Sequence, residues 1–175
     1  MRGLGTQFTP KPDDTPNWTT TERMTSYLSQ AGHRSFNWTP PNGYPDRQAA
    51  WASTGAMAMC MKLLAWLPEM KIDYQAATPL FAADIVAQTQ VQFPTAGART
   101  AAAMIGWWCD RLLGYRPEPL YGVVSAFLQQ NATVSEALDI NVDAWNGSNL
   151  KIHYTQQRLR TAVGMLLMGP DNFRR

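Results

Sequence analysis

The segment from Ala31 to Gly55 constrains the fold more than any other part of this chain. It contains Pro40, Pro41 and Pro45, and each proline fixes its own φ and disfavours helical backbone for the residue before it. Asn42-Gly43 between them is typical of a turn. Because helical patterns lie on both sides, we expect a stiff, structured loop that joins two helices.

This loop carries Phe36, Trp38 and Tyr44, which a stiff backbone would hold in place. Rigid aromatic side chains either fill a neighbouring core or line a concave site for a sugar, an aromatic ligand or a partner chain. The core is the interpretation we favour, because aromatic side chains bury large areas. If the loop lines a site, its substrate-binding residues would be His33, Trp38, Asn42, Tyr44, Asp46 and Trp51.

Acid and base groups come together only at His33 and Asp46 in this loop. His33 could act as a general base oriented by Asp46. The structural interpretation is preferred: His33 caps the carbonyl end of the preceding helix, and Asp46 caps the start of the next. No H-E-x-x-H, G-x-S-x-G, P-loop or G-x-G-x-x-G pattern is present. The sequence therefore nominates no catalytic residue, no metal ligand and no cofactor, and favours a chain that is not an enzyme on its own.

The loop and the end of the chain together resemble a known family. The pattern L-x-x-A-G-x-x-x-F-x-W-x-P-P-N-G-Y-P-D-x-x-x-x-W-x-S-x-G is carried by Leu28, Ala31, Gly32, Phe36, Trp38, Pro40, Pro41, Asn42, Gly43, Tyr44, Pro45, Asp46, Trp51, Ser53 and Gly55. It resembles the C-terminal region of the bacterial domain of unknown function 1800 family. The end, Gly169–Arg175, is similar to that family's Ser-Pro-Glu-Phe-Gln-Arg-Arg type tail. One departure is Cys60–Leu63, where the family usually has an Arg-Trp-Asn-Phe-like helix.

The resemblance implies a context but no reaction, since the family has no established activity. Its members are longer, usually exported, and often encoded beside a second family of unknown function. It follows that this chain would be the C-terminal part of a longer protein, periplasmic or extracellular. We expect a non-catalytic module that packs on its own N-terminal region or on a partner protein. The alternative is part of an enzyme or of a polysaccharide-binding surface lined by the His33–Trp51 loop.

Hydrophobic periodicity indicates an all-α fold, with about six helices in an orthogonal or irregular bundle around the long loop. Residues 1–18 are expected to form an N-terminal strap or ragged end, anchored by Leu4, Phe8 and Trp18. Residues 19–175 are expected to form a single helical domain. The inward positions of the last helix are Leu159, Ala162, Val163, Leu166 and Leu167; those of the helix after Pro119 are Leu120, Val123, Val124, Phe127 and Leu128.

Local signals suggest where several of these helices begin and end. Thr78-Pro79 predicts the start of a helix that continues past Val86, and Thr95 predicts the cap of the next one, which ends at Gly114. Asp84, Asp110 and Arg111 are interpreted as exposed charges on amphipathic helices. Only 72–74 resembles a strand, and 139–153 is expected to be a polar loop with a turn at residues 146–148.

Charge and cysteine usage exclude several kinds of partner. Charged residues make up only 16% of the chain and the net charge is +2, too little to indicate nucleic acid or an anionic membrane. With so few charged residues, we expect apolar surface that packs on the rest of the parent protein or on another protein. No segment approaches the ~20 apolar residues of a membrane span. Cys60 and Cys109 are read as two buried thiols, with one disulfide as the alternative for an exported protein.

Overall fold

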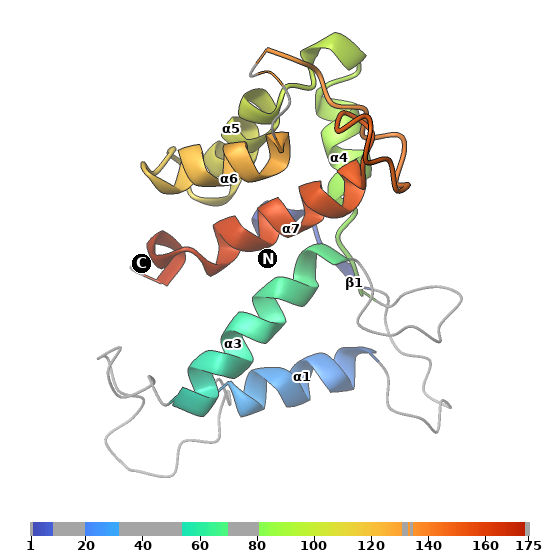
Figure 1. Cartoon of the computed structure of the whole chain (residues 1–175). Coiled ribbons are helices and arrows are strands. Elements are labelled where there is room, and N and C mark those ends of the chain that lie inside the picture. The colour runs from blue at the N-terminus through green and yellow to red at the C-terminus, as the bar shows by residue number, and fades with distance from the viewer. Residues whose placement is uncertain are drawn as a thin grey trace, which may run out of the picture.

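A computed structural model describes residues 2–8, 20–31, 54–69, 81–130, 133 and 135–173 (Figure 1). The described residues contain six α-helices: α1 (Thr20–Gln30), α3 (Thr54–Trp66), α4 (Ile85–Gln92), α5 (Ala101–Leu112), α6 (Leu120–Gln129) and α7 (Thr155–Met168). Short 3-10 turns are η1 (Arg2–Leu4), η2 (Leu67–Glu69), η3 (Ala96–Ala98) and η4 (Pro170–Phe173). Two strands of two residues each, β1 (Gln7–Phe8) and β2 (Phe81–Ala82), pair antiparallel. The all-α class predicted from the sequence is confirmed.

Helix α7 lies at the centre of the molecule and packs against α3, α4, α5 and α6 (Figure 1). Its apolar residues recur at helical spacing, and the five expected to face inward, Leu159, Ala162, Val163, Leu166 and Leu167, are all buried. The space beside Gly164 is small, since a Cβ there would lie 3.7 Å from Pro68 Cγ and 3.9 Å from Ala65 Cα. The end of α3 therefore passes close to the backbone of α7.

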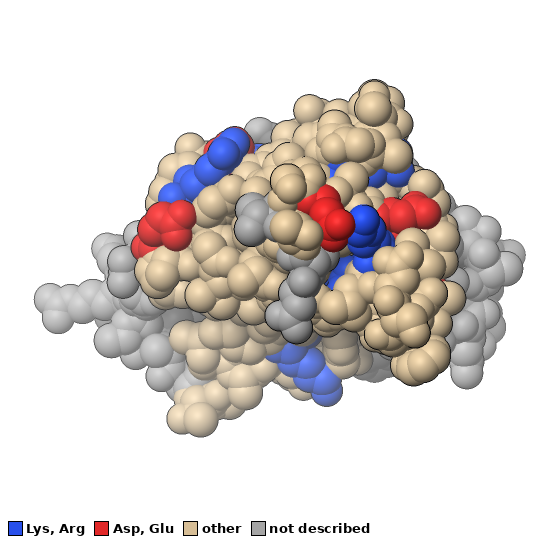
Figure 2. Space-filling view, turned by 45° about the horizontal axis from the view of Figure 1, so that its top comes forward, with Lys and Arg blue, Asp and Glu red and all other residues tan. Residues whose placement is uncertain are grey.

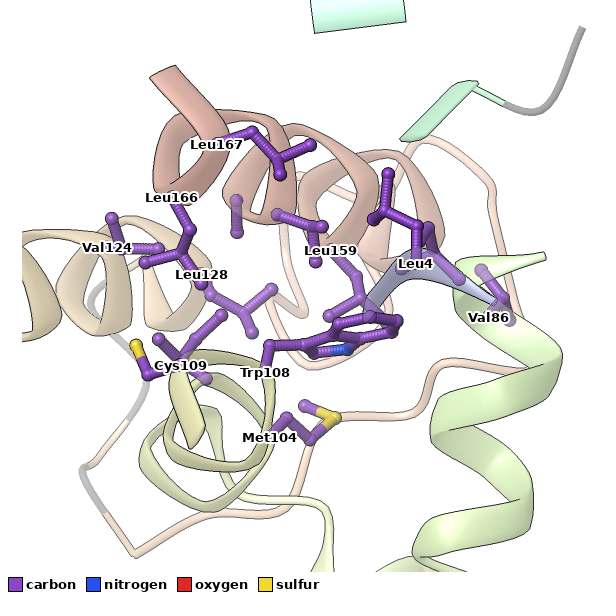
Figure 3. Close-up of a cluster of buried hydrophobic side chains, with 14 of the residues drawn as sticks. Leu4, Val86, Met104, Trp108, Cys109, Val124, Leu128, Leu159, Leu166 and Leu167 are labelled. Atoms are coloured by element: carbon purple, nitrogen blue, oxygen red, sulfur yellow. The ribbon is translucent and has the colours of Figure 1, made fainter. Parts of the chain in front are cut away.

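Trp108 of α5 is the largest fully buried side chain among the described residues (Figure 3). Its indole Nε1 donates a hydrogen bond of 3.0 Å to Thr89 Oγ1, and that hydroxyl donates to the Ile85 carbonyl at 2.7 Å. Both side chains are 0% exposed, so each polar atom that is taken from water finds a partner. This pair of bonds fixes α4 against α5 inside the core.

The first residues of the chain are held against α4 and α5. Leu4, one of the three expected anchors, is 1% exposed and packs in the core. Its carbonyl accepts a 2.9 Å hydrogen bond from Gln88 Nε2, while the Gly3 carbonyl accepts one from Arg111 Nε. Phe8 lies in β1, and Trp18 is outside the described residues.

Two helix starts differ from the sequence prediction. The helix expected from Thr78-Pro79 begins instead at Ile85, because Phe81–Ala82 pairs with β1 and Asp84 caps the first turn through a 2.9 Å bond from the Ala87 amide. Asp84 is therefore a cap rather than a charge on a helix face. Thr95 precedes only η3 and makes no side-chain cap bond. Thr100 caps α5 by accepting from the Ala103 amide at 3.2 Å.

Other local predictions have mixed outcomes. Gly114, at φ 81°, follows α5 in the left-handed conformation expected of a terminating glycine. Val123 was expected to face inward but is 56% exposed, whereas Val124 and Leu128 are buried. The inward face of α6 is thus narrower than the run of apolar residues suggests.

Both cysteines are free, so the alternative of a disulfide between Cys60 and Cys109 is wrong. Cys109 is buried as expected, and Cys60 is half-buried. The helix start expected at Asp46 and the strand-like piece at 72–74 lie outside the described residues.

Candidate functional site

The six residues that the sequence nominated for ligand binding belong to a segment outside the described residues. They are His33, Trp38, Asn42, Tyr44, Asp46 and Trp51, and their roles remain predictions. The helices on either side of that segment are described. Tyr27 of α1 and Trp66 of α3 meet edge to face, with ring centroids 5.1 Å apart, and Ala31 is buried where α1 ends.

The structure brings together a different group of aromatic side chains, which we call the loop aromatic cluster: Trp145, His153 and Tyr154. The His153 ring lies 6.2 Å from the Trp145 ring and 5.0 Å from the Tyr154 ring, both measured between centroids and both edge to face. Trp145 is 73% exposed and Tyr154 is 42% exposed. Two exposed rings, each in contact with the His153 ring between them, are therefore displayed at the surface.

Backbone pairing explains how the cluster forms. Ala144 and His153 form a parallel bridge, and the Tyr154 amide donates to the Ala144 carbonyl at 3.0 Å. The Asn146 amide donates a 2.8 Å hydrogen bond to His153 Nδ1. In a neutral imidazole, that bond places the ring proton on Nε2. The Nε2–H group is then a donor with no partner among the described residues.

The chain leaves the cluster through an unusual backbone conformation. Tyr154 precedes the first turn of α7 with φ 44° and ψ 41°, in the left-handed region that non-glycine residues rarely occupy. Such a conformation persists only where neighbouring contacts hold it. Here those contacts are the amide bond to Ala144 and the ring contact with His153.

The rest of the 139–154 loop is fastened to the helices by buried polar groups. The hydroxyl of Thr155, which is fully buried, lies within hydrogen-bond distance of the Asp139 and Val142 carbonyls. Arg158 Nη2 donates to the Leu150 carbonyl at 2.8 Å, and its Nη1 donates to Gln130 Oε1 at 2.8 Å. Burial lowers the pKa of Arg158. The loop is therefore attached to α7 at several points, although it has little regular structure.

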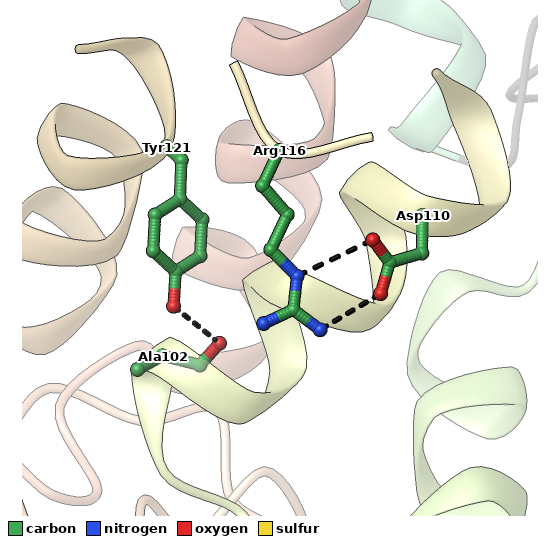
Figure 4. Close-up of polar contacts among 4 residues, drawn as sticks. All are labelled: Ala102, Asp110, Arg116 and Tyr121. Atoms are coloured by element: carbon green, nitrogen blue, oxygen red, sulfur yellow. Dashed lines mark hydrogen bonds and ion pairs between the residues drawn. The ribbon is translucent and has the colours of Figure 1, made fainter. Parts of the chain in front are cut away.

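A second polar group joins α5 to the start of α6 (Figure 4). Arg116 makes two hydrogen bonds to the Asp110 carboxylate, at 3.3 Å and 2.8 Å, and its guanidinium carbon lies 5.9 Å from the centre of the Tyr121 ring. The Tyr121 hydroxyl donates to the Ala102 carbonyl at 3.2 Å. Gly106 leaves space for the Arg116 side chain, because a Cβ at position 106 would lie 2.9 Å from the Arg116 guanidinium carbon.

The charges of this group stabilise each other. The hydrogen bonds to Arg116 lower the pKa of the Asp110 carboxyl, and the same bonds raise the pKa of Arg116. Such a carboxylate stays ionised at neutral pH and is a poor proton acceptor. The prediction that Asp110 is an exposed charge is confirmed, and the structure adds that it orders the connection between two helices.

Neither a metal-binding group nor a membrane-spanning helix is found in the described residues. Within the described ranges, no group of three or more His, Cys, Asp or Glu side chains could hold a metal ion. None of the helices in the described part is long and apolar enough to cross a bilayer. Arg99, which is 6% exposed, donates to the Phe93 carbonyl at 2.8 Å and serves to hold backbone.

Sequence reasoning placed Trp145 in a polar loop and assigned it no role. The signal that could have found the cluster is the occurrence of Trp145 and Tyr154 in a segment without apolar periodicity, on either side of the Asn146-Gly147 turn. Large aromatic residues in such a segment have no core face to join. The contact of each ring with His153 depends on the Ala144–His153 bridge, which no local pattern predicts.

Comparisons with known proteins agree with the resemblance of the loop and tail. No curated protein and no solved structure matches this chain. One family model does, over residues 2–173, which is nearly the whole sequence. With its all-α fold and that match, the chain belongs to the family described as "Protein of unknown function (DUF1800)".

Proposed function

We propose that this chain is a non-catalytic helical module of an exported bacterial protein, and that it packs through α3 on another polypeptide. That polypeptide is the N-terminal region of its own parent protein or a separate partner. Export and the longer parent rest on what the family resemblance implies. The packing surface rests on the described structure, and above all on the composition of α3 compared with its burial.

Helix α3 is apolar on all sides, yet it is only partly covered. Lys62 is its single charged residue. Only Ala56 and Leu63 within the helix are buried. The half-buried residues are Met57, Met59, Cys60, Met61, Leu64, Ala65 and Trp66.

A helix that is apolar all round is normally buried all round. Covering the remaining apolar surface would contribute roughly 25 cal/mol for each Å² removed from water. Three of the half-buried side chains are methionines, which adapt their shape to a partner surface. The polar end of Lys62 does not oppose such packing, because its Nζ lies 4.7 Å from the centre of the Trp66 ring on the same helix.

The rest of the surface is consistent with this proposal. Figure 2 shows Lys, Arg, Asp and Glu side chains as small separate groups among uncharged residues on the face in view. With charged residues at 16% of the chain, solvent-facing charge is sparse. A protein interface requires depletion of charge at its centre, which α3 provides.

The two free cysteines allow a direct test. Cys60 is half-buried on α3, whereas Cys109 is buried in the core and its pKa is raised to about 11 by burial and by the nearby Asp110. Alkylation by N-ethylmaleimide, followed by mass spectrometry, should therefore modify Cys60 and spare Cys109 in the folded chain. In the full-length parent protein or its native assembly, we expect Cys60 to react at least about tenfold more slowly.

The alkylation rate of Cys60 is compared in three samples: the isolated chain, the purified full-length protein and the native assembly. This comparison separates the two possible partners. Protection in the purified full-length protein identifies its own N-terminal region, and protection only in the native assembly identifies a partner protein. In the sample where Cys60 is protected, Met59→Lys should restore its reactivity by placing a charge on the α3 surface. Val91→Lys, on the exposed side of α4, should not. Equal alkylation rates in all three samples would refute docking through α3.

A further inference from the structure

We propose that the loop aromatic cluster binds a neutral saccharide, with the exposed Trp145 ring as the stacking surface. This inference goes beyond docking through α3 and uses a different part of the molecule. It rests on three features of the cluster: an exposed ring with close neighbours on two sides, hydrogen-bond donors in the same cluster, and a local charge that does not favour anionic ligands.

The Trp145 ring is exposed and has close neighbours on two sides. It is 73% exposed, and the His153 ring lies against it at 6.2 Å. The turn that follows also approaches it closely, since a Cβ on Gly147 would lie 3.1 Å from Trp145 Cζ2. Any larger residue there would require the indole to shift by a few tenths of an ångström. A ring with such neighbours has less conformational entropy to lose when a ligand stacks on it.

Hydrogen-bond donors lie next to this ring. Asn146 Oδ1 accepts from the Ser148 and Asn149 amides, at 3.1 Å and 3.0 Å, which identifies the amide oxygen and leaves the NH₂ group as a donor. The Nε2–H group of His153 is the second donor. Neither donor has a partner among the described residues. A pyranose ring presents an apolar C–H face to an aromatic ring and hydroxyl oxygens to donors, which is the combination found here.

Charge disfavours a nucleic acid as the ligand. Residues 139–154 contain Asp139, Asp143 and Lys151, so the formal charge of the loop is −2 + 1 = −1. The Nζ of Lys151 forms an ion pair of 2.8 Å with Glu136. Stacking of nucleobases is normally accompanied by a positively charged groove that follows the phosphates, and this loop provides none.

The size of the apolar area disfavours a protein. The cluster contains three rings, and the other exposed residues of the 139–153 loop near Trp145 in sequence, 141, 143 and 147–149, are polar or glycine, apart from Ala144. A standard protein interface covers about 800 Å² on each partner and has an apolar centre. One or two sugar units match an area of this size better than a protein partner does.

The experiment uses the whole chain and soluble neutral polysaccharides of different backbones: xylan, laminarin, hydroxyethyl cellulose and dextran. Affinity gel electrophoresis measures how strongly each polysaccharide slows the folded protein. We expect retardation by at least one of them, and for that polysaccharide Trp145→Ala should weaken binding by about tenfold or more. Trp145→Phe, which keeps a smaller ring, should weaken it less.

Two further variants separate recognition from folding. His153→Asn keeps an acceptor for the Asn146 amide but removes the Nε2 donor and the ring, so it should weaken binding while the chain still unfolds cooperatively, as circular dichroism measures. Val123→Ala alters an exposed apolar residue on α6, outside the loop, and should change nothing. If Trp145→Ala fails to fold, the wild-type indole Hε1 NMR signal of Trp145, assigned with Trp145→Phe, should still shift on titration.

The proposal is overturned if none of the four polysaccharides slows the folded wild-type chain. It is also overturned if folded Trp145→Ala is retarded as strongly as wild type, or if the Trp145 signal does not move at saturating polysaccharide. These results are independent of Cys60 protection, so docking through α3 and binding at the loop can fail separately.

Discussion

The α5–α6–α7 core and the α1–α3 pair use similar residue types but bury them very differently. In the core, Trp108, Met104 and Leu166 are 0% exposed. In α3, Trp66, Met59 and Leu64 are only half-buried. The difference shows that apolar composition alone does not locate a core. What matters is whether the apolar residues of a helix face other helices on every side.

Periodicity explains part of this difference. In α5 and α7 the buried residues recur three or four positions apart and meet at the centre of the molecule (Figure 3). In α3 no such face exists, because apolar residues occupy every side of the helix. The first arrangement fits a helix that completes a core within one chain. The second fits a helix that needs an additional partner.

The largest loss of stability is expected from Trp108→Ala in the core, and Trp66→Ala in α3 is its comparison. Trp108→Ala should reduce the free energy of unfolding by about 3–5 kcal/mol, because it creates a cavity in the core and leaves the buried Thr89 hydroxyl without its indole partner. Trp66→Ala in α3 should cost about 1–2 kcal/mol, since the side chain is already half-exposed. Urea unfolding followed by circular dichroism measures both. Equal losses would mean that α3 is as well buried as α5.

A buried cation tests whether the core also depends on polar contacts. Arg158→Met removes the donors to Gln130 Oε1 and the Leu150 carbonyl, and we expect a loss of about 1–3 kcal/mol. Arg160→Met is the matched control on the same helix, because its Nη2 bonds only to Gln156 one turn away. Thermal denaturation of the two variants should show a clearly larger drop for Arg158→Met. The same drop in both would assign the effect to helix α7 in general.

Alkaline pH should weaken the core through Cys109. Burial, with Asp110 nearby, raises the pKa of this thiol from 9.0 to about 11 in the folded chain. Between these values the unfolded chain loses the proton and the folded chain keeps it, so stability should fall as pH rises through this window. Cys109→Ala should make that fall shallower when melting temperatures are measured from pH 8 to pH 11.

Cys60→Ala is the comparison for this experiment, because burial also raises the pKa of the Cys60 thiol but by a smaller amount. We expect its alkaline slope to stay closer to that of wild type. A Cys109→Ala slope indistinguishable from wild type would show that other groups cause the alkaline loss of stability.

The smallest effect is expected at the exposed end of α5. Asp110→Asn removes the ion pair with Arg116, but both side chains are about half exposed, at 50% and 52%, and water screens the pair. The urea midpoint at neutral pH should stay within the error of the measurement. Because the folded pKa of Asp110 is lowered, any contribution is present at neutral pH and is lost on acidification. A loss comparable to that of Trp108→Ala would contradict this ranking.

Periodicity predicted the helices better than capping residues predicted their ends. The five inward positions of α7 follow from spacing alone. The start of α4 does not, because Thr78-Pro79 has good capping chemistry, but the chain pairs Phe81–Ala82 with β1 instead. Thr100 rather than Thr95 caps α5 for a similar reason: the backbone bridge between Thr100 and Ala137 fixes which threonine lies at the helix end.

The two candidate sites also differ in whether local sequence or tertiary contacts define them. The Pro-rich loop between α1 and α3 was nominated from sequence, because the restriction that proline places on φ is a local property; its role stays a prediction, since the loop lies outside the described residues. The cluster of Trp145, His153 and Tyr154 was not found, because its contacts need Tyr154 in a left-handed conformation, which sequence propensity does not favour. Nothing short of the folded loop brings these rings together.

By itself, the sequence determined the all-α class, the inward positions of α7 and the family of the chain, since these depend on residue spacing and on recognisable motifs. Only the tertiary structure decided which apolar helix is covered, which threonine or aspartate becomes a cap, and which aromatic rings meet at the surface. The physical reason is that burial and cross-chain hydrogen bonds join residues distant in sequence, so they outweigh local preferences worth about 1 kcal/mol or less each.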